Sequence, residues 1–216
     1  MTEEIALHGY RYSVYNRVAR LALHLKDVSY AMVEVDPFSK LDPAYLQLHP
    51  FGRVPTLVHG TFSVFETRAI TRYIDQAFSG PPLQPVGAKS LARMDQVTGI
   101  IDSHGYWPMV RQVFSQRVFS RLEGEPPNED EIAAGLAASH NVLAVLDGIA
   151  EEGLVLDGRD FTLADCHLAP MIDYFVRADE GRDALSSYPN LYRWWERVST
   201  MPVLESTDPK LPDPVS

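Results

Sequence analysis

The chain has little cysteine, little basic charge and few uninterrupted apolar stretches, and each shortage argues against a class of function. Cys166 is the only cysteine in 216 residues, so an internal disulfide framework is excluded and a reducing compartment is favoured. The formal net charge of −10 argues against a nucleic-acid surface, which needs clustered Lys and Arg. We find no signal peptide and no apolar run long enough to cross a bilayer. These features predict a soluble cytoplasmic protein with no nucleic-acid or membrane partner.

Motifs for several common chemistries are also missing. The seven histidines are scattered, without an H-x-x-x-H pattern or paired cysteines, so we expect no metal site. There is no G-x-S-x-G turn and no phosphate-binding P-loop. Cys166 follows Asp165 inside an expected buried helix and is interpreted as a small core residue.

The composition is that of a folded protein with two different halves. A hydrophobic content of 45% is sufficient for real cores. The run Gly-Pro-Pro-Leu-Gln-Pro, residues 80–85, interrupts regular structure. We therefore predict an N-terminal domain over residues 1–80, a linker over 81–87 and a C-terminal domain over 88–216.

The first half alternates strand and helix signals. Short strands are expected at 5–7, 30–35, 56–58 and 62–65, with His59 and Gly60 in the turn of a hairpin. Apolar residues at helical spacing predict a helix from about Val18 to Leu25 and another that begins near Thr67, and a short helix is expected at 43–48. This order predicts an α/β domain, a mixed four-stranded sheet of the thioredoxin-like kind with helices on its faces.

The second half has no strand signal and is predicted to be all-helical. The expected helices cover residues 89–121, 129–151, 163–178 and 191–200. Thr162 and Asp165 have the spacing of a capping box, in which each side chain accepts from the other's backbone N–H, and we interpret them as a folding element. Trp194 and Trp195 are interpreted as core and surface packing, and the proline-rich residues beyond Met201 as a tail.

The segment from His49 to Ile74, HPFGRVPTLVHGTFSVFETRAITRYI, carries the strongest functional signal. Pro55 cannot donate to a sheet, so Val54-Pro55 belongs at a corner before a strand and is a candidate cis bond. A cis bond would turn the backbone groups of Val54 outward, where an extended peptide could pair with them. Glu66 and Thr67 lie where a helix begins, and the unpaired N–H groups there favour an anionic ligand group.

These residues resemble the glutathione-binding half of the soluble glutathione transferases, and the helical second half extends the resemblance over nearly the whole chain. The match is F-G-R-V-P followed by F-E-T-R-A-I-T-R-Y-I, with Thr67 where the family usually has Ser. The resemblance implies that Glu66 and Thr67 hold the γ-glutamyl end of glutathione, with simple helix capping as the alternative. It also implies that Val54 pairs with the cysteinyl backbone of glutathione and that Pro55 is cis. It further implies that Arg53 reaches the ligand's backbone or carboxylate, with a solvated surface role as the alternative. Lys40 lies where phi-like members place a basic residue for the glycyl carboxylate.

The thiol-activating residue is predicted at the first turn. Glutathione chemistry needs a thiolate, and a hydroxyl at a helix N-terminus can stabilise one. In G-Y-R-Y-S-V-Y-N-R, Ser13 occupies the position of the activating serine in the serine-type, phi-like or theta-like, members and their bacterial relatives. A simple helix N-cap is the alternative for Ser13, and Tyr12 is the rival hydroxyl donor. No cysteine lies near this turn, so this chain lacks the nucleophile that the disulfide-forming members of the family use.

The resemblance also implies an electrophile pocket and a second subunit. Tyr106, Trp107 and Val110 lie close together in an expected helix and are predicted to line the pocket, with core packing as the alternative. Phe51 occupies the place where some members insert an aromatic side chain into a partner, so a homodimer is expected.

The resemblance as a whole predicts a cytoplasmic detoxification enzyme that conjugates the glutathione thiolate to small hydrophobic electrophiles. Glutathione would be the co-substrate, and no metal would be required. Two alternatives remain: a non-catalytic protein that binds glutathione and apolar ligands, and a glutathione-dependent peroxidase or isomerase.

Overall fold

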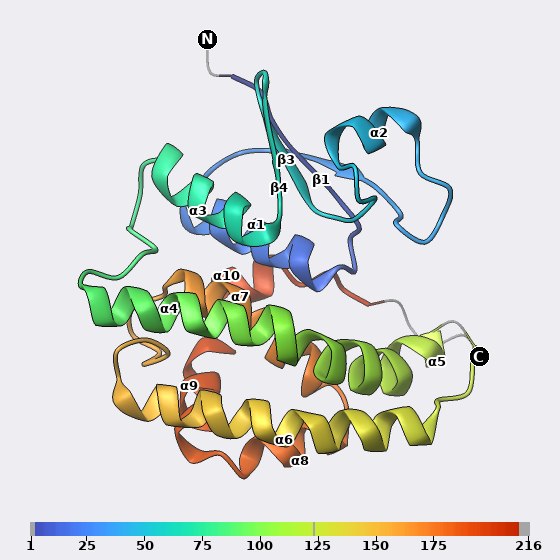
Figure 1. Ribbon diagram of the computed structural model, residues 1–216, viewed down its shortest axis with the longest axis vertical. Coiled ribbons are helices and arrows are strands. Elements are labelled where there is room, and N and C mark those ends of the chain that lie inside the picture. The colour runs from blue at the N-terminus through green and yellow to red at the C-terminus, as the bar shows by residue number, and fades with distance from the viewer. Residues whose placement is uncertain (1–2, 123, 212–216) are drawn as a thin grey trace. The chain divides into compact units, whose positions relative to one another are not determined.

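The computed structural model describes residues 3–122 and 124–211 (Figure 1). Two compact units divide the chain. The first contains residues up to Leu83 together with Ser206–Pro209, and the second contains Gln84–Glu205.

The first unit is built on one mixed sheet of four strands. These are β1 (Ile5–Gly9), β2 (Ala31–Glu34), β3 (Thr56–His59) and β4 (Phe62–Phe65), in the order β2-β1-β3-β4. β1 is parallel to β2 and antiparallel to β3, which is antiparallel to β4. The predicted thioredoxin-like α/β architecture is therefore confirmed. The hairpin turn lies at Gly60-Thr61, one residue later than predicted, because His59 is the last residue of β3.

Three helices accompany the sheet. α1 (Val14–Leu25) and α3 (Thr67–Ala77) pack against each other, and α2 (Pro43–Leu48) lies near β4 on the other side of the strands (Figure 1). Apolar residues that recur along α1 and α3 meet central strand residues in a core with no exposed side chains, which includes Leu7, Val18, Leu21, Leu57, Ile70 and Ile74. A late segment joins this unit, because the Arg20 guanidinium donates from Nη1 to the Thr207 carbonyl at 3.0 Å.

The second unit is all-helical, as predicted. It contains α4 (Ala88–Ile100), two π-helical segments η1 (Ile101–Gly105) and η2 (Trp107–Phe119), α5 (Ser120–Leu122), α6 (Glu129–Glu152), α7 (Leu163–Phe175), α8 (Asp179–Ser186) and α9 (Pro189–Val198). α6 packs along η2 and against α9, while α7 packs against α4 and η2.

The structure corrects three details of the predicted helices. The helix expected over 89–121 is α-helical to Ile100, continues as the π-helical segments η1 and η2, and returns to α-helix at Ser120. Within η2, Pro108 has no N–H with which to make an α-helical hydrogen bond. α8 was not predicted, because its sequence, DEGRDALS, is short and largely polar. The tail expected beyond Met201 begins with a short helix, α10 (Pro202–Ser206).

α6 is long and apolar enough to resemble a membrane span, which the sequence analysis did not anticipate. Its mean hydropathy reaches 1.4. However, it begins with Glu129, Asp130 and Glu131 and buries one regularly spaced face against the unit's own core. An amphipathic core helix accounts for this pattern.

Candidate active site

The sheet register brings the predicted ligand-binding segments to one edge of the first unit. His8 pairs with Thr56, and Thr56 pairs with Phe65 on its other side. The turn after β1, the loop before β3 and the start of α3 after β4 therefore leave the sheet at the same end. Because β2 runs parallel to β1, with Gly9 beside Glu34, the segment that follows β2 leaves there too.

Ser13 is the N-cap of α1. Its extended backbone (φ −69°, ψ 123°) and its Oγ, which accepts from the Asn16 N–H at 3.3 Å, begin the helix. Its own N–H donates to the Tyr10 carbonyl at 2.9 Å. The hydroxyl proton of Ser13 has no acceptor in the part of the chain that the structure describes. The N-cap role is thus real, and it leaves the hydroxyl able to donate to a ligand beside the positive end of the helix dipole.

Tyr12, the rival donor, lies one residue before the cap. Its ring packs edge-on against Tyr10, with centroids 5.5 Å apart, and Tyr10 in turn packs against Phe38 at 5.8 Å. Tyr12 is thus part of an aromatic cluster that flanks the turn, whereas Ser13 stands at the helix start itself.

A buried amide holds this turn in place. Asn16 has no exposed surface, and its Nδ2 donates to the Tyr10 carbonyl at 3.1 Å. Gly9 lies against the same amide, and a Cβ on Gly9 would fall 2.3 Å from Asn16 Oδ1. Glycine is therefore required at the end of β1, and the sequence motif alone did not identify Asn16 as its reason.

The loop before β3 contains the predicted cis bond, Val54-Pro55. Tyr45 of α2 braces this loop, since its hydroxyl donates to the Arg53 carbonyl at 2.5 Å and lies 3.3 Å from Thr56 Oγ1. Burial raises the pKa of the Tyr45 phenol, which keeps it protonated as a donor. Sequence reasoning missed Tyr45, because a tyrosine in a short amphipathic helix has no motif around it.

His49 is a second support that the sequence analysis did not single out. Its side chain is 2% exposed, its ring centroid lies 4.6 Å from that of Phe65, and its carbonyl accepts from the Gly52 N–H at 2.9 Å. Burial lowers the pKa of His49, while the charge of Glu66 acts in the opposite direction. His49 thus packs the loop against the end of β4, next to Glu66.

Glu66 has an unusual backbone conformation for a helix N-cap. It is the N-cap of α3, yet its φ is +67° and its side chain makes no capping hydrogen bond. A positive φ is uncommon for a residue with a Cβ and costs free energy that the surrounding fold must supply. The helix start is therefore left open, with Glu66 exposed and Thr67 8% exposed beside it.

The two predicted basic residues lie on segments that reach this edge. Arg53 and Lys40 are exposed, and neither side chain forms an ion pair with any residue in 3–122 or 124–211. The segment that bears Lys40 is shaped by Asp36, whose carboxylate accepts from the Phe38 N–H at 2.9 Å and the Ser39 hydroxyl at 2.6 Å. These hydrogen bonds lower the pKa of Asp36. Both cations are available to an anionic ligand.

The three residues predicted for the electrophile pocket have different environments in the second unit. Trp107 is 60% exposed, Tyr106 is partly exposed and Val110 is 6% exposed. Val110 thus belongs to the helical core, while Trp107 and Tyr106 offer ring surface. No cluster of three potential metal ligands occurs among residues 3–122 and 124–211.

Comparisons with known proteins identify the family. Residues 7–82 match the glutathione S-transferase N-terminal domain, and residues 106–202 match the C-terminal domain. The chain is 30% identical over 196 residues to glutathione S-transferase F13 of Arabidopsis thaliana, with 88% of this chain and 89% of that protein covered.

Solved structures agree. The apo form of glutathione S-transferase III has a TM-score of 0.84 and 27% identity, with 99% of each chain covered. A theta-class glutathione S-transferase from Xanthomonas axonopodis pv. citri, solved with glutathione bound, has a TM-score of 0.79 and 27% identity over 95% of this chain and 97% of that one. The family predicted from the sequence is confirmed: the chain belongs to the glutathione S-transferases and is an enzyme of the transferase class.

Proposed function

We propose that this transferase binds glutathione at the edge of its sheet and that Ser13 stabilises the thiolate for attack on small hydrophobic electrophiles. The observation that carries the proposal is the register that aligns three features: the Ser13 turn, the cis Val54-Pro55 corner and the open start of α3 at Glu66. A γ-linked tripeptide has a backbone, a thiol and anionic ends that such an edge can bind.

Each residue would bind a different part of the ligand. The Val54 backbone would pair with the cysteinyl residue, as an added strand would. Glu66 and Thr67 would hold the γ-glutamyl amine and carboxylate, and Lys40 and Arg53 would supply positive charge to the carboxylates. Tyr106 and Trp107, with Val110 behind them, would contribute apolar surface to the electrophile.

The chemical step follows from the acidity of the thiol. A free thiol has a pKa near 8.5, so only a few per cent is ionised at neutral pH. Lowering that pKa by about two units takes about 2.7 kcal/mol of extra stabilisation of the anion. The Ser13 hydroxyl would donate to the sulfur anion next to the α1 N-terminus, and the anion would then attack the electrophilic carbon as the leaving group departs.

Two wider expectations belong to the same proposal. Phe51, 72% exposed on the glutathione-binding unit, would insert into a second copy to form a homodimer. The protein would act in the cytoplasm, in detoxification, where the thiol of the buried Cys166 stays reduced.

The test is a comparison of Ser13→Ala with Tyr12→Phe. We expect Ser13→Ala to reduce kcat/KM for conjugation by roughly 100-fold, the factor that corresponds to two pKa units. The dissociation constant of glutathione should change little, and Tyr12→Phe should retain most of the activity. If Tyr12→Phe loses the activity instead, the tyrosine is the donor. Glutathione binding without thiolate formation in the unaltered protein would favour the non-catalytic alternative.

A further inference from the structure

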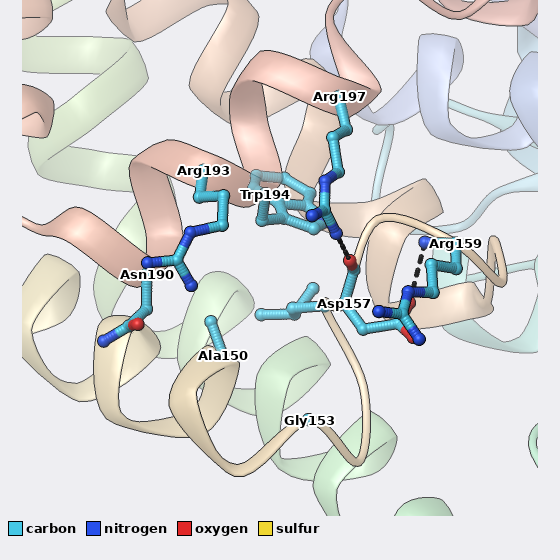
Figure 2. A pocket seen from close by; sticks show the side chains of 9 residues that line it. Ala150, Gly153, Asp157, Arg159, Asn190, Arg193, Trp194 and Arg197 are labelled. Atoms are coloured by element: carbon cyan, nitrogen blue, oxygen red, sulfur yellow. Dashed lines mark hydrogen bonds between the residues drawn. The ribbon is translucent and has the colours of Figure 1, made fainter.

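Four residues of α9 lie on one helical face, over a cavity in the second unit. Asn190, Arg193, Trp194 and Arg197 occupy positions i, i+3, i+4 and i+7, a spacing that places side chains on the same side of an α-helix. All four line a cavity of about 250 Å³. Figure 2 shows the two arginines of α9 above the end of α6, with Arg159 on the loop that follows it.

The lining of this cavity is strongly basic. It carries three guanidinium groups and one carboxylate, in a chain whose net charge is −10. Guanidinium groups stay protonated in proteins and offer planar sets of donors that suit oxyanions. Arg159 and Arg193 form no ion pair within the described residues, and Arg197 donates from Nη1 to the Asp157 carbonyl at 2.7 Å.

Two acidic residues near these arginines, Asp157 and Asp147, accept hydrogen bonds from backbone N–H groups. Asp157 Oδ1 accepts from the N–H groups of Arg159 at 2.8 Å and Asp160 at 3.2 Å. Asp147 of α6 accepts from the N–H groups of Asn190 at 2.7 Å and Leu191 at 2.9 Å, at the start of α9. Neither carboxylate forms an ion pair with the cavity arginines, so the positive charge of the cavity remains largely uncompensated.

The loop fits closely around one of the arginines. Gly158 has a φ of +70°, and a Cβ there would lie 2.9 Å from Cδ of Arg197. The glycine therefore lets the loop pack against the Arg197 stem, whose guanidinium holds the Asp157 carbonyl. Trp194, 1% exposed, is fixed from behind by a hydrogen bond from Nε1 to Asp165 Oδ1 at 2.7 Å. The cavity is thus bounded by a braced loop and an anchored helix.

We propose that this cavity, lined by Arg159, Arg193 and Arg197, binds a small, multiply charged oxyanion of the phosphate or sulfate class. The guanidinium groups would bind the anion, while Ala150 and Leu156 would contact an apolar substituent. The site consists of residues of the second unit alone and does not depend on the function proposed for the first unit. Because the arginines are exposed, binding should weaken as salt is added.

The test is calorimetric titration of the full-length protein with inorganic pyrophosphate at constant, low ionic strength. We expect Arg193→Gln to weaken binding roughly tenfold, which corresponds to the loss of about one charge-assisted hydrogen bond. The double variant, with Arg193→Gln and Arg197→Gln together, should bind more weakly still. Arg182→Gln is the matched control, since Arg182 is an exposed arginine paired with Asp179 at 2.9 Å. The control should bind as the unaltered protein does. A parallel titration with inorganic sulfate tells which of the two anions the cavity prefers.

Three outcomes would overturn the inference. The first is no detectable heat with the unaltered protein at ~10 mM pyrophosphate, where a millimolar site would be largely occupied. The second is equal affinity in the unaltered protein and in Arg193→Gln. The Arg193 side chain makes no hydrogen bond to another residue that the structure describes, and thermal melting checks that the variant is folded. The third is displacement of pyrophosphate by glutathione, which would place the anion at the glutathione edge instead.

Discussion

The Tyr45 hydroxyl donates to the Arg53 carbonyl at 2.5 Å, which ties α2 to the loop that ends in the cis Val54-Pro55 bond. The same loop carries the Val54 backbone that is proposed to pair with glutathione. The loop before β3 is therefore held by a side chain from a separate helix as well as by the contacts of His49.

Replacing Tyr45 with Phe should weaken glutathione binding. The loss of one hydrogen bond costs about 1 kcal/mol. If glutathione must order the loop when it binds, this cost raises the dissociation constant roughly fivefold. Calorimetry with glutathione measures it. Tyr73→Phe is the matched control, because the Tyr73 hydroxyl lies 2.8 Å from His59 Nδ1 at the opposite end of β3. Equal weakening in both variants would contradict the role of Tyr45.

Replacing Gly9 with Ala should disturb the first turn. The new Cβ would meet the buried Asn16 amide at 2.3 Å, so either the amide or the end of β1 must move. We expect a loss of roughly 1–3 kcal/mol in the free energy of unfolding, the usual cost of overpacking a core. Denaturant unfolding measures the change. Gly99→Ala, where the new Cβ would meet nothing beyond its own stretch of helix within 4 Å, should be neutral or slightly stabilising.

Replacing Asp165 with Ala should destabilise the helical unit. Its carboxylate has no exposed surface and accepts from the Thr162 N–H at 2.8 Å, the Thr162 hydroxyl at 2.7 Å and Trp194 Nε1 at 2.7 Å. Removing it leaves buried donors without a partner, at a cost of roughly 3 kcal/mol. Asp173→Ala, in the same helix but in a partly exposed ion pair with Arg177, should cost less than about 1 kcal/mol. Similar melting temperatures for the two variants would refute this account.

Replacing Lys26 with Met should destabilise the first unit. Lys26 Nζ lies 2.7 Å from Asp75 Oδ1, and both side chains are at most 5% exposed. Breaking such a buried pair from one side costs about 3–5 kcal/mol, because the remaining charge stays buried without its counter-ion. Chemical denaturation measures the loss. A change below 1 kcal/mol, the usual upper value for a surface pair, would show that the pair is solvated.

The stability of the first unit should fall in mild acid. Burial lowers the pKa of His49 below 6.5 in the folded state, so the unfolded chain binds more protons just below pH 6.5. The free energy of unfolding therefore increases as the pH rises through that window and decreases as the pH falls through it. His8 and His24, whose pKa values burial also lowers, contribute with the same sign. His49→Gln should reduce this pH dependence, which denaturant unfolding at several pH values measures, and an unchanged dependence in His49→Gln would contradict the role of His49.

Much of the fold could be predicted from the sequence, because local patterns determine it. The Val54-Pro55 corner, the short strands and the Thr162–Asp165 capping box each depend on a few adjacent residues, and the structure confirms them. The supports of the site could not be predicted. Tyr45, Asn16 and His49 act on residues from three to eight positions away or on another element, through contacts that have no sequence signature. The cavity arginines show helical spacing in α9, but only the folded loop brings Arg159 to them.

The central claim is that Ser13 promotes ionisation of the bound thiol, and ultraviolet difference titration of glutathione on the protein tests it directly. The account predicts an apparent thiol pKa about two units below the free value of roughly 8.5, and a return toward the free value in Ser13→Ala. A bound thiol that titrates like free glutathione in the unaltered protein, or an equally low pKa in Ser13→Ala, would contradict it.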